Sequence, residues 1–405
     1  MNFIDESKLI LEKEIFSRRE IEKRMVDGGF NSLAKFELFV WDLEMFLQLQ
    51  KELGDKLILK GGAATQFYIP ITAQRTSIDI DMICLAKPDE VYAAISKIEN
   101  ELNGEGEYAK FVRYTPQNPK VGLSALETYH EVVPSVCDER ELYATHGRQQ
   151  VKIEFLYSNA KYEIQKIKQP ELFALETEEE FNILALNNLF ADKLTTLGPN
   201  TIGISDERSD EQLKQVYDVI TLFISNIDQI IRDKEEVRTN YSKVAKMECE
   251  FRNMMYDPKI LLQDMMFLIN RIKKIEDDNA LLQKANDFQA LYLRRVVNRD
   301  KAGWTIVGYQ LELLIEYIFL DDTKILQFKK IEELIEKLSF NNISGPERGQ
   351  LIRKVRNTLE VKFAHLRSLT SEIFRKRLDR IIWEIATFVT YEELENSIRE
   401  IIDME

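Results

Sequence analysis

The segment Leu57–Ala86, LILKGGAATQFYIPITAQRTSIDIDMICLA, decides how the rest of the chain is interpreted. Its first four residues favour a β-strand, and Gly61 and Gly62 then allow a sharp turn and a close approach of the backbone to a ligand. Residues 63–67 can begin a helix, whose free N–H groups attract an anion. A second strand is expected over residues 78–85. The segment therefore predicts a strand, a glycine turn, a helix and a strand in that order.

Two carboxylates lie two residues apart in the second predicted strand. Side chains alternate between the faces of a strand, so Asp79 and Asp81 share one face while Ile78, Ile80 and Met82 take the other. Neighbouring carboxylates repel each other, and a divalent metal that also holds a nucleoside triphosphate would compensate their charge. A Gly-Gly pair alone is usually only a turn, and an Asp-x-Asp alone is usually a solvated edge. Their ordered combination is much more specific.

In this order the residues resemble the nucleotidyltransferase superfamily typified by DNA polymerase beta, and within it the AbiEii/AbiGii toxin family. Two runs carry the resemblance: Lys60-Gly61-Gly62-Ala63-Ala64 and Arg75-Thr76-Ser77-Ile78-Asp79-Ile80-Asp81. The resemblance covers roughly the first 230 residues. It implies that Asp79 and Asp81 bind Mg²⁺, with Mn²⁺ as the alternative metal.

The resemblance also implies a set of nucleotide-binding residues, namely Lys60, Gly61, Gly62, Thr65, Arg75 and Ser77. One position departs from the superfamily pattern, which usually has a Ser or Thr directly after the two glycines. This chain has Ala63, so one hydroxyl donor to the phosphates is missing. Thr65, two residues later, is the nearest hydroxyl in the sequence.

A third carboxylate is expected on another strand. Residues 149–157 alternate between polar and apolar side chains, which places Lys152 and Glu154 on one face. The resemblance implies that Glu154 joins Asp79 and Asp81 as a metal ligand or acts as a general base. The alternative is that Glu154 belongs to the polar face of a half-exposed strand.

Two predicted helices carry the remaining site residues. Thr177 with Glu180 predicts a capping box and a helix that continues to Leu197, and Ser209 with Gln212 predicts the start of a second helix. In these helices the resemblance covers Ala191-Asp192-Lys193-Leu194-Thr195-Thr196-Leu197 and Lys214-Gln215-Val216-Tyr217-Asp218-Val219, where Gln215 replaces a commoner Asp.

The resemblance implies that Lys193 neutralises triphosphate charge and that Asp218 holds this lysine or the base region in place. The alternatives are a solvated helix lysine for Lys193 and an ion pair with Lys214 for Asp218.

The composition indicates a soluble cytoplasmic protein of two domains. The chain has 405 residues, 44% of them hydrophobic, and a formal net charge of −14, which disfavours generalised nucleic-acid binding. No apolar run is long enough to cross a membrane, and the three cysteines show no spacing typical of zinc sites or disulfide frameworks. We expect an α+β protein. Residues 1–235 would form a nucleotidyltransferase domain, with N-terminal helices and a small mixed sheet, and residues 236–405 an all-helical domain.

The predicted helical domain contains a locally basic segment within an acidic protein. Its basic residues are Arg348, Arg353, Lys354, Arg356, Lys362, Arg367, Arg375, Lys376, Arg377 and Arg380. Such a segment is either an ordinary solvated helix surface or a surface for an RNA backbone.

The resemblance implies the toxin of a toxin–antitoxin or phage-abortive system. Such a toxin transfers a nucleoside monophosphate from an NTP to an acceptor, with tRNA the first expectation and an antitoxin protein as partner. The alternatives are a transferase that modifies a small molecule or a protein, and a nucleotide-binding protein that has lost catalysis. A purely structural helical protein would leave the pairing of Asp79 and Asp81 without a purpose.

Overall fold

A computed structural model describes residues 5–103, 111–114, 126–137, 148–339, 343, 345–366 and 372–402. The chain forms two compact units. The first consists of Met1–Leu261 and Lys284–Asn298, and the second consists of Leu262–Gln283 and Arg299–Glu405. The domain boundary expected between residues 235 and 236 stays a prediction.

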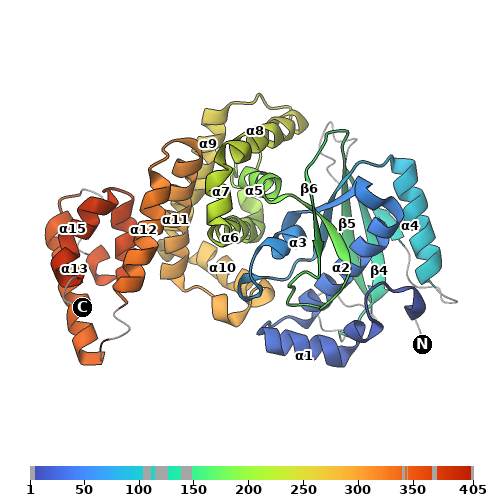
Figure 1. Ribbon diagram of the computed structural model, residues 1–405, viewed down its shortest axis with the longest axis horizontal. Helices are drawn as coiled ribbons and strands as arrows, with labels where there is room; N and C mark the ends of the chain where they lie inside the picture. Colours follow the sequence, from blue (N-terminus) through green and yellow to red (C-terminus); the bar gives the residue numbers. More distant parts are fainter. Residues whose placement is uncertain are drawn as a thin grey trace. The chain divides into compact units, whose positions relative to one another are not determined.

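The first unit is built on a mixed sheet that, in the described part of the chain, has seven strands in the order β3-β4-β5-β2-β1-β7-β6 (Figure 1). The strands are β1 (Leu57–Lys60), β2 (Asp79–Cys84), β3 (Phe111–Tyr114), β4 (Leu126–Pro134), β5 (Arg148–Tyr157), β6 (Ile164–Lys168) and β7 (Glu180–Leu184). Strand β2 lies between β1, to which it is antiparallel, and β5, to which it is parallel. The predicted strand, turn, helix and strand over residues 57–85 are confirmed, as is the α+β class.

Ten α-helices are described up to residue 292, and their residues 262–283 belong to the second unit. They are α1 (Arg18–Gly28), α2 (Leu33–Leu53), α3 (Gly61–Thr65), α4 (Pro88–Leu102), α5 (Leu186–Thr195), α6 (Ser209–Ser225), α7 (Ile227–Arg232), α8 (Lys234–Phe251), α9 (Pro258–Lys273) and α10 (Asn279–Tyr292). Helix α2 packs against β1, β2, β5 and β7, and its residues 33–49 are all buried. The sheet and α2 therefore form the core that fixes the position of β2.

The helix predicted to start at Thr177 is wrong at its beginning. Residues 180–184 form β7, which pairs with both β1 and β6, and α5 starts only at Leu186. The Thr177 hydroxyl accepts a hydrogen bond from the Glu179 N–H at 3.2 Å, which is a local turn. A short apolar run such as Phe181–Leu184 suits a buried strand as well as a helix, and pairing with β1 decides between them. Strand β6 was not predicted.

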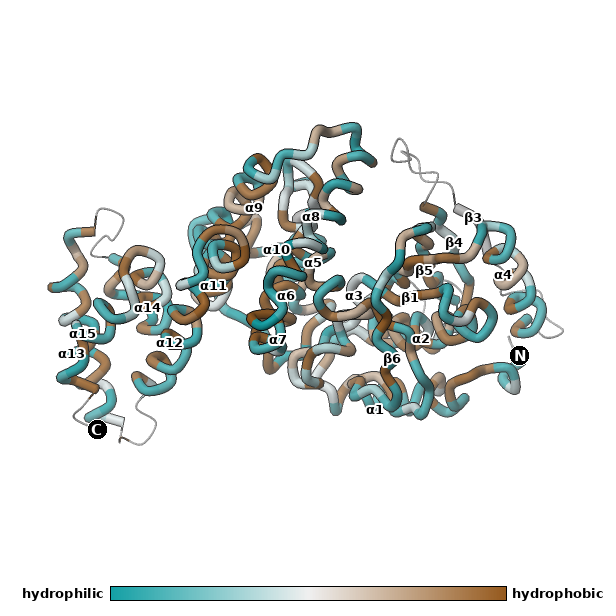
Figure 2. The backbone as a smooth tube through the Cα atoms, turned by 45° about the horizontal axis from the view of Figure 1, so that its top comes forward, coloured by the Kyte–Doolittle hydropathy of each residue, from teal (hydrophilic) through white to brown (hydrophobic). Residues whose placement is uncertain are grey.

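The described residues of the second unit contain helices and no strand. Besides the parts of α9 and α10 that it includes, its helices are α11 (Lys301–Phe319), α12 (Lys324–Lys337), α13 (Gly345–Phe363), α14 (Leu378–Ala386) and α15 (Tyr391–Ile402). Helix α11 is mostly buried and apolar (Figure 2), and it packs against α12 and α14. The capping box of Thr390 and Glu393 is confirmed, with hydrogen bonds of 3.3 Å and 3.0 Å. None of the helices in the described ranges has the length and apolar character that crossing a membrane requires.

Part of the predicted basic segment is neutralised by acids that are distant in sequence. The Lys376 Nζ lies 2.9 Å from a carboxylate oxygen of Glu276, and Arg380, which is buried, donates to the same glutamate at 3.0 Å. Arg377 donates to both carboxylate oxygens of Asp300 at 2.9 Å. These three residues are therefore part of the ion-pair network of the second unit. On α13, Arg353 and Lys362 are exposed. Arg367 lies outside the described residues.

Helix α2 carries a buried carboxyl group, Asp42, whose pKa is affected by the charges of the paired aspartates on β2. Asp42 is 1% exposed, and neither of its carboxylate oxygens has a hydrogen-bond partner among the described residues. Burial raises the pKa of Asp42 well above its usual value, and the carboxylates of Asp79 and Asp81 raise it further. Both effects favour the protonated form of Asp42 in the folded protein.

We predict that Asp42→Asn stabilises the fold at neutral pH. Unfolding releases the Asp42 proton above the ordinary aspartate pKa of about 4, so this group lowers the stability of the native protein as the pH rises. The variant should melt roughly 2–4 °C higher than the native protein at pH 7.5, for a gain of about 1 kcal/mol, and the gain should shrink toward pH 4. Asp27→Asn, at an exposed position of α1, is the control and should show no such pH dependence. A variant that melts lower than the native protein at every pH would contradict the prediction.

Candidate active site

The paired carboxylates lie on one accessible face of the sheet, where each has a neighbour on β5. Asp81 lies beside Glu154 on β5 and beside Lys60 on β1, and Asp79 lies beside Lys152. All five residues line one cavity of about 330 Å³, together with Gly61, Asp192, Lys193 and Gln215. The structure thus brings Asp79, Asp81 and Glu154 to one cavity, as the resemblance implied.

Negative charge is concentrated at the floor of this cavity. Burial raises the pKa of Asp81 to about 7, and the neighbouring carboxylates of Glu154 and Asp79 act in the same direction. Burial also raises the pKa of Asp79. Although burial opposes it, the Lys152 ammonium, 3.0 Å from a Glu154 carboxylate oxygen, holds the pKa of Glu154 below its usual value. The two aspartates therefore form a site that a cation would stabilise.

The two glycines pack against the residues that follow them in the motif. Gly61 has φ +71°, and a Cβ on it would overlap the Asp81 carboxylate, so only glycine fits this position. A Cβ on Gly62 would lie 2.7 Å from an Arg75 guanidinium nitrogen and 2.9 Å from the Ser77 Oγ. The turn therefore has no room for side chains because the Asp-x-Asp strand and the loop before it are in contact with the turn.

The hydroxyl of Thr65 is engaged inside the protein. It donates a hydrogen bond to the Gly61 carbonyl oxygen at 3.0 Å, and both Thr65 and Ala63 are buried. The hydroxyl next to the second glycine belongs to Ser77. The nucleotide-binding roles of Thr65 and Ser77 stay predictions.

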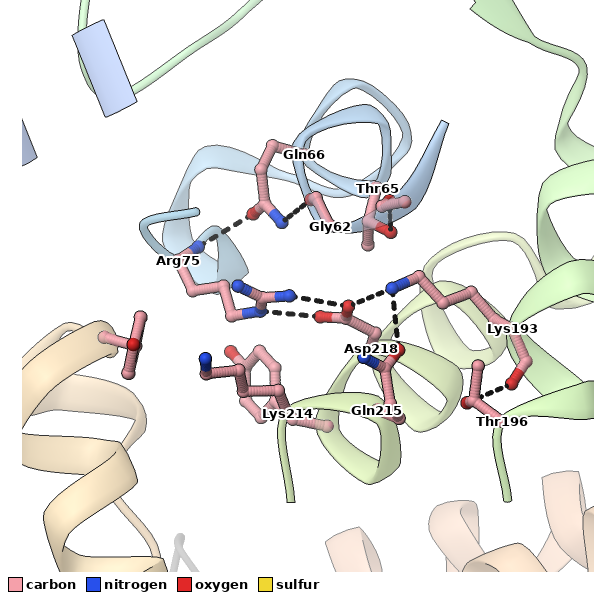
Figure 3. Close-up of polar contacts among 12 residues, drawn as sticks. Gly62, Thr65, Gln66, Arg75, Lys193, Thr196, Lys214, Gln215 and Asp218 are labelled. Atoms are coloured by element: carbon pink, nitrogen blue, oxygen red, sulfur yellow. Dashed lines mark hydrogen bonds and ion pairs between the residues drawn. The ribbon is translucent and has the colours of Figure 1, made fainter. Parts of the chain in front are cut away.

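Asp218 on α6 joins two cationic side chains from other parts of the chain. Arg75 donates from Nε and Nη2 to the two carboxylate oxygens, each at 2.7 Å, and the Lys193 Nζ donates to one of them at 2.7 Å (Figure 3). Lys193 also donates to the Gln215 amide oxygen at 2.8 Å. Although burial opposes it, the charges of Arg75 and Lys193 keep the pKa of Asp218 below its usual value. Gln215, at the position where the family commonly has Asp, thus helps to hold the lysine.

The alternative interpretations of Lys193 and Asp218 are both wrong. The Lys193 side chain is 3% exposed, so it is not a solvated helix lysine. Lys214 pairs with Glu211 at 2.6 Å and places its ammonium 4.2 Å from the centre of the Tyr292 ring, so it is not the partner of Asp218. The arrangement agrees with the sequence-based expectation that Asp218 holds the lysine in place.

Lys60 is fixed at the cavity wall by a residue that the sequence did not single out. Its Nζ lies 3.2 Å from a carboxylate oxygen of Asp192, which directly precedes Lys193 on α5. Burial opposes protonation of Lys60, but Asp192 and Asp81 together raise its pKa above the usual value. Lys152, also missed as a site residue, was detectable because alternation already placed it beside Glu154.

A comparison with protein families matches residues 46–301 to the nucleotidyl transferase AbiEii toxin of type IV toxin–antitoxin systems. The chain belongs to the AbiEii nucleotidyl transferase toxin family. This match covers more than half of the chain and confirms the resemblance found in the sequence. It continues past residue 230, where the resemblance was expected to end, and so includes helices α8, α9 and α10. A search of curated proteins gives no match.

The donor set of this AbiEii family member suits a metal that is shared with a substrate. Across the described ranges, no group of three or more His, Cys, Asp or Glu side chains is arranged to hold a metal ion. Asp79 and Asp81 supply two carboxylates, and Mg²⁺ is commonly bound by one or two carboxylates together with substrate phosphates and water. Their oxygen chemistry and their shared negative charge fit that mode of binding.

We predict that Asp218→Asn strongly destabilises the first unit. The substitution leaves Arg75 and Lys193 buried without a counter-charge, which costs about 3–5 kcal/mol in comparable buried pairs. Denaturant unfolding should show this loss as a lower midpoint. Asp192→Asn is the matched control, since that side chain is 19% exposed and its pair with Lys60 is longer, so about 1 kcal/mol is expected. Equal losses in the two variants would show that Asp218 does not hold the cluster together.

Proposed function

We propose that the chain transfers a nucleoside monophosphate from an NTP to an acceptor hydroxyl, with Mg²⁺, or Mn²⁺ as the alternative, held by Asp79 and Asp81. One observation carries this proposal: two half-buried carboxylates form the floor of a cavity whose wall contains the glycine turn and a fixed lysine. The anionic floor suits the metal ion, and the cationic wall suits the triphosphate that the metal ion would carry.

The bound metal would supply charge neutralisation for the phosphates and for the attacking oxygen. The residues of the chain do the rest by position. The acceptor oxygen forms a bond to the α-phosphorus, the bond from that phosphorus to the bridging oxygen of pyrophosphate breaks, and the acceptor loses its proton. Glu154, kept ionised by Lys152, is placed beside Asp81 to take that proton or to complete the metal site.

The cationic wall serves the leaving group. Lys193 is immobilised by Asp218 and Gln215, so its ammonium can stabilise charge that develops on pyrophosphate without first being ordered. Lys60 is fixed in the same way by Asp192. The backbone N–H groups after Gly61 provide further phosphate donors. Arg75 acts indirectly. Its two hydrogen bonds hold the Asp218 carboxylate, which in turn positions Lys193.

The acceptor we propose is RNA, with tRNA as the first candidate, and the partner we propose is an antitoxin protein. The family is one of type IV toxin–antitoxin systems, which supports the antitoxin. The exposed basic residues of α13 support RNA. A protein or small-molecule acceptor is the competing proposal. A catalytically silent protein is the other competitor, and Ala63 favours it because the usual hydroxyl after the glycines is absent.

We predict that Asp81→Asn abolishes transfer without loss of stability. The neutral amide has nearly the same shape and removes a buried charge, but it binds a metal poorly. The assay incubates the native protein and the variant with each α-labelled NTP, Mg²⁺, total cellular RNA and total cellular protein. Label on RNA with the native protein alone supports the proposal. Label on protein moves the acceptor to a protein hydroxyl. NTP binding without label on either would leave a small-molecule acceptor or a silent protein.

We predict that reversing two charges on α13 weakens RNA binding. Arg353→Glu with Lys362→Glu removes two exposed cations, so the affinity for total tRNA should fall and its dependence on salt should become less steep. Lys329→Glu with Lys337→Glu on α12 changes the net charge equally and is the control. RNA binding that falls by the same amount in both double variants would reflect net charge and not a surface on α13.

A further inference from the structure

The accessible face of the sheet continues beyond the carboxylates as a second row of polar side chains. In the first row Thr128 on β4 lies beside Glu154, which lies beside Asp81. In the next row His130 on β4 lies beside Lys152, which lies beside Asp79. Neighbouring strands are about 4.8 Å apart, so Lys152 is one strand and His130 is two strands away from the proposed metal position.

Among the described residues, the ion-pair partner of Lys152 is Glu154. Its ammonium group carries three N–H bonds, and Glu154 accepts one of them at 3.0 Å. Burial opposes its charge, but Glu154 and Asp79 hold the pKa of Lys152 above its usual value. The side chain is 35% exposed and lines the cavity, and His130 beside it is half-buried. A charged donor therefore faces the cavity on the β5 side.

The proposed reaction assigns opposite sides of the cavity to the two substrates. The glycine turn, Lys60 and Lys193 come from β1, α3 and α5, so the triphosphate and its leaving group take that side. Displacement at the α-phosphorus proceeds with the attacking and leaving oxygens roughly in line. The acceptor hydroxyl must then approach from the side of β5 and β4, where Lys152 and His130 lie.

We propose that Lys152, with His130 beside it, binds a phosphate group adjacent to the attacking hydroxyl of the acceptor. The site would then take the end of an RNA strand, in which a phosphodiester lies next to the terminal ribose. This inference rests on the proposed nucleotidyl transfer and adds to it the part of the acceptor that is recognised. Lys152 suits this role because an ammonium group forms charge-assisted hydrogen bonds with phosphate oxygens and can turn from Glu154 toward them.

The test distinguishes a contact between Lys152 and the acceptor from a role of Lys152 that is limited to neutralising Glu154. The probe is a short RNA with a free 3′ hydroxyl, compared with the same RNA carrying an uncharged methylphosphonate at its last linkage. Affinities are measured without NTP for the native protein, Lys152→Gln, Lys152→Arg and the control Lys166→Gln. Lys166 is also a strand lysine in an ion pair, with Asp55, but it lies on β6.

The native protein and Lys166→Gln should bind the charged RNA about 10-fold more tightly than the neutral one, since one charge-assisted bond is worth about that much. Lys152→Gln should lose this difference, and Lys152→Arg should keep most of it. In the transfer assay Lys152→Gln should raise the KM for RNA by a larger factor than the KM for NTP, and kcat should also fall because Lys152 keeps Glu154 ionised.

Two results would overturn the inference while leaving nucleotidyl transfer intact. One is a native protein that transfers label to RNA but binds both probes equally. The other is a Lys152→Gln variant that still discriminates between them. A native protein that neither binds the RNA nor labels any RNA would instead overturn the RNA acceptor of the proposed function, and the inference with it.

Discussion

The buried carboxylate of Asp218 is the point on which the site depends. It receives three hydrogen bonds, two from Arg75 before β2 and one from Lys193 on α5, while being itself part of α6. Three segments distant in sequence are thereby fixed to one group. Removing such charges from water costs several kcal/mol, which their mutual attraction repays only with good geometry. As a result, the position of Lys193 is fixed before any substrate binds.

Around this cluster the cavity is divided by charge. The floor, formed by β2 and β5, carries Asp79 and Asp81, whose pKa values are raised by burial. The wall, formed by β1 and α5, carries Lys60 and Lys193, whose ammonium groups pair with Asp192 and Asp218. Lys152 is the exception, because it is a cation within the acidic rows. An enzyme that binds a triphosphate needs cationic groups that attract the phosphates and acidic groups that remain available for a metal. Separating the two kinds of group within the cavity meets both requirements.

The sequence predicted most of this site because the relevant signals are local. Period-two alternation placed Asp79 with Asp81 and Lys152 with Glu154, and the glycines marked the turn. The register that sets Asp81 beside Glu154 could not be predicted, since it depends on pairing between strands some seventy residues apart in sequence. Asp192 lay within a family-like run, but its pairing with Lys60 arises from tertiary packing, as do the ion pairs of Lys376, Arg377 and Arg380. The error at Phe181–Leu184 has the same origin: a neighbouring strand determined the structure of a segment whose own residues allowed two.

The contact between Gly61 and Asp81 also constrains how this family can diverge. A side chain at position 61 is excluded for two reasons: its Cβ would overlap Asp81, and the backbone there has φ +71°, a conformation that favours glycine. Replacing the aspartate would relieve the overlap and leave the backbone conformation unchanged, so glycine stays favoured at position 61 even in a lineage that abandons the reaction. The glycine should therefore outlast the chemistry it serves, and its presence in a relative reports on the turn and not on activity.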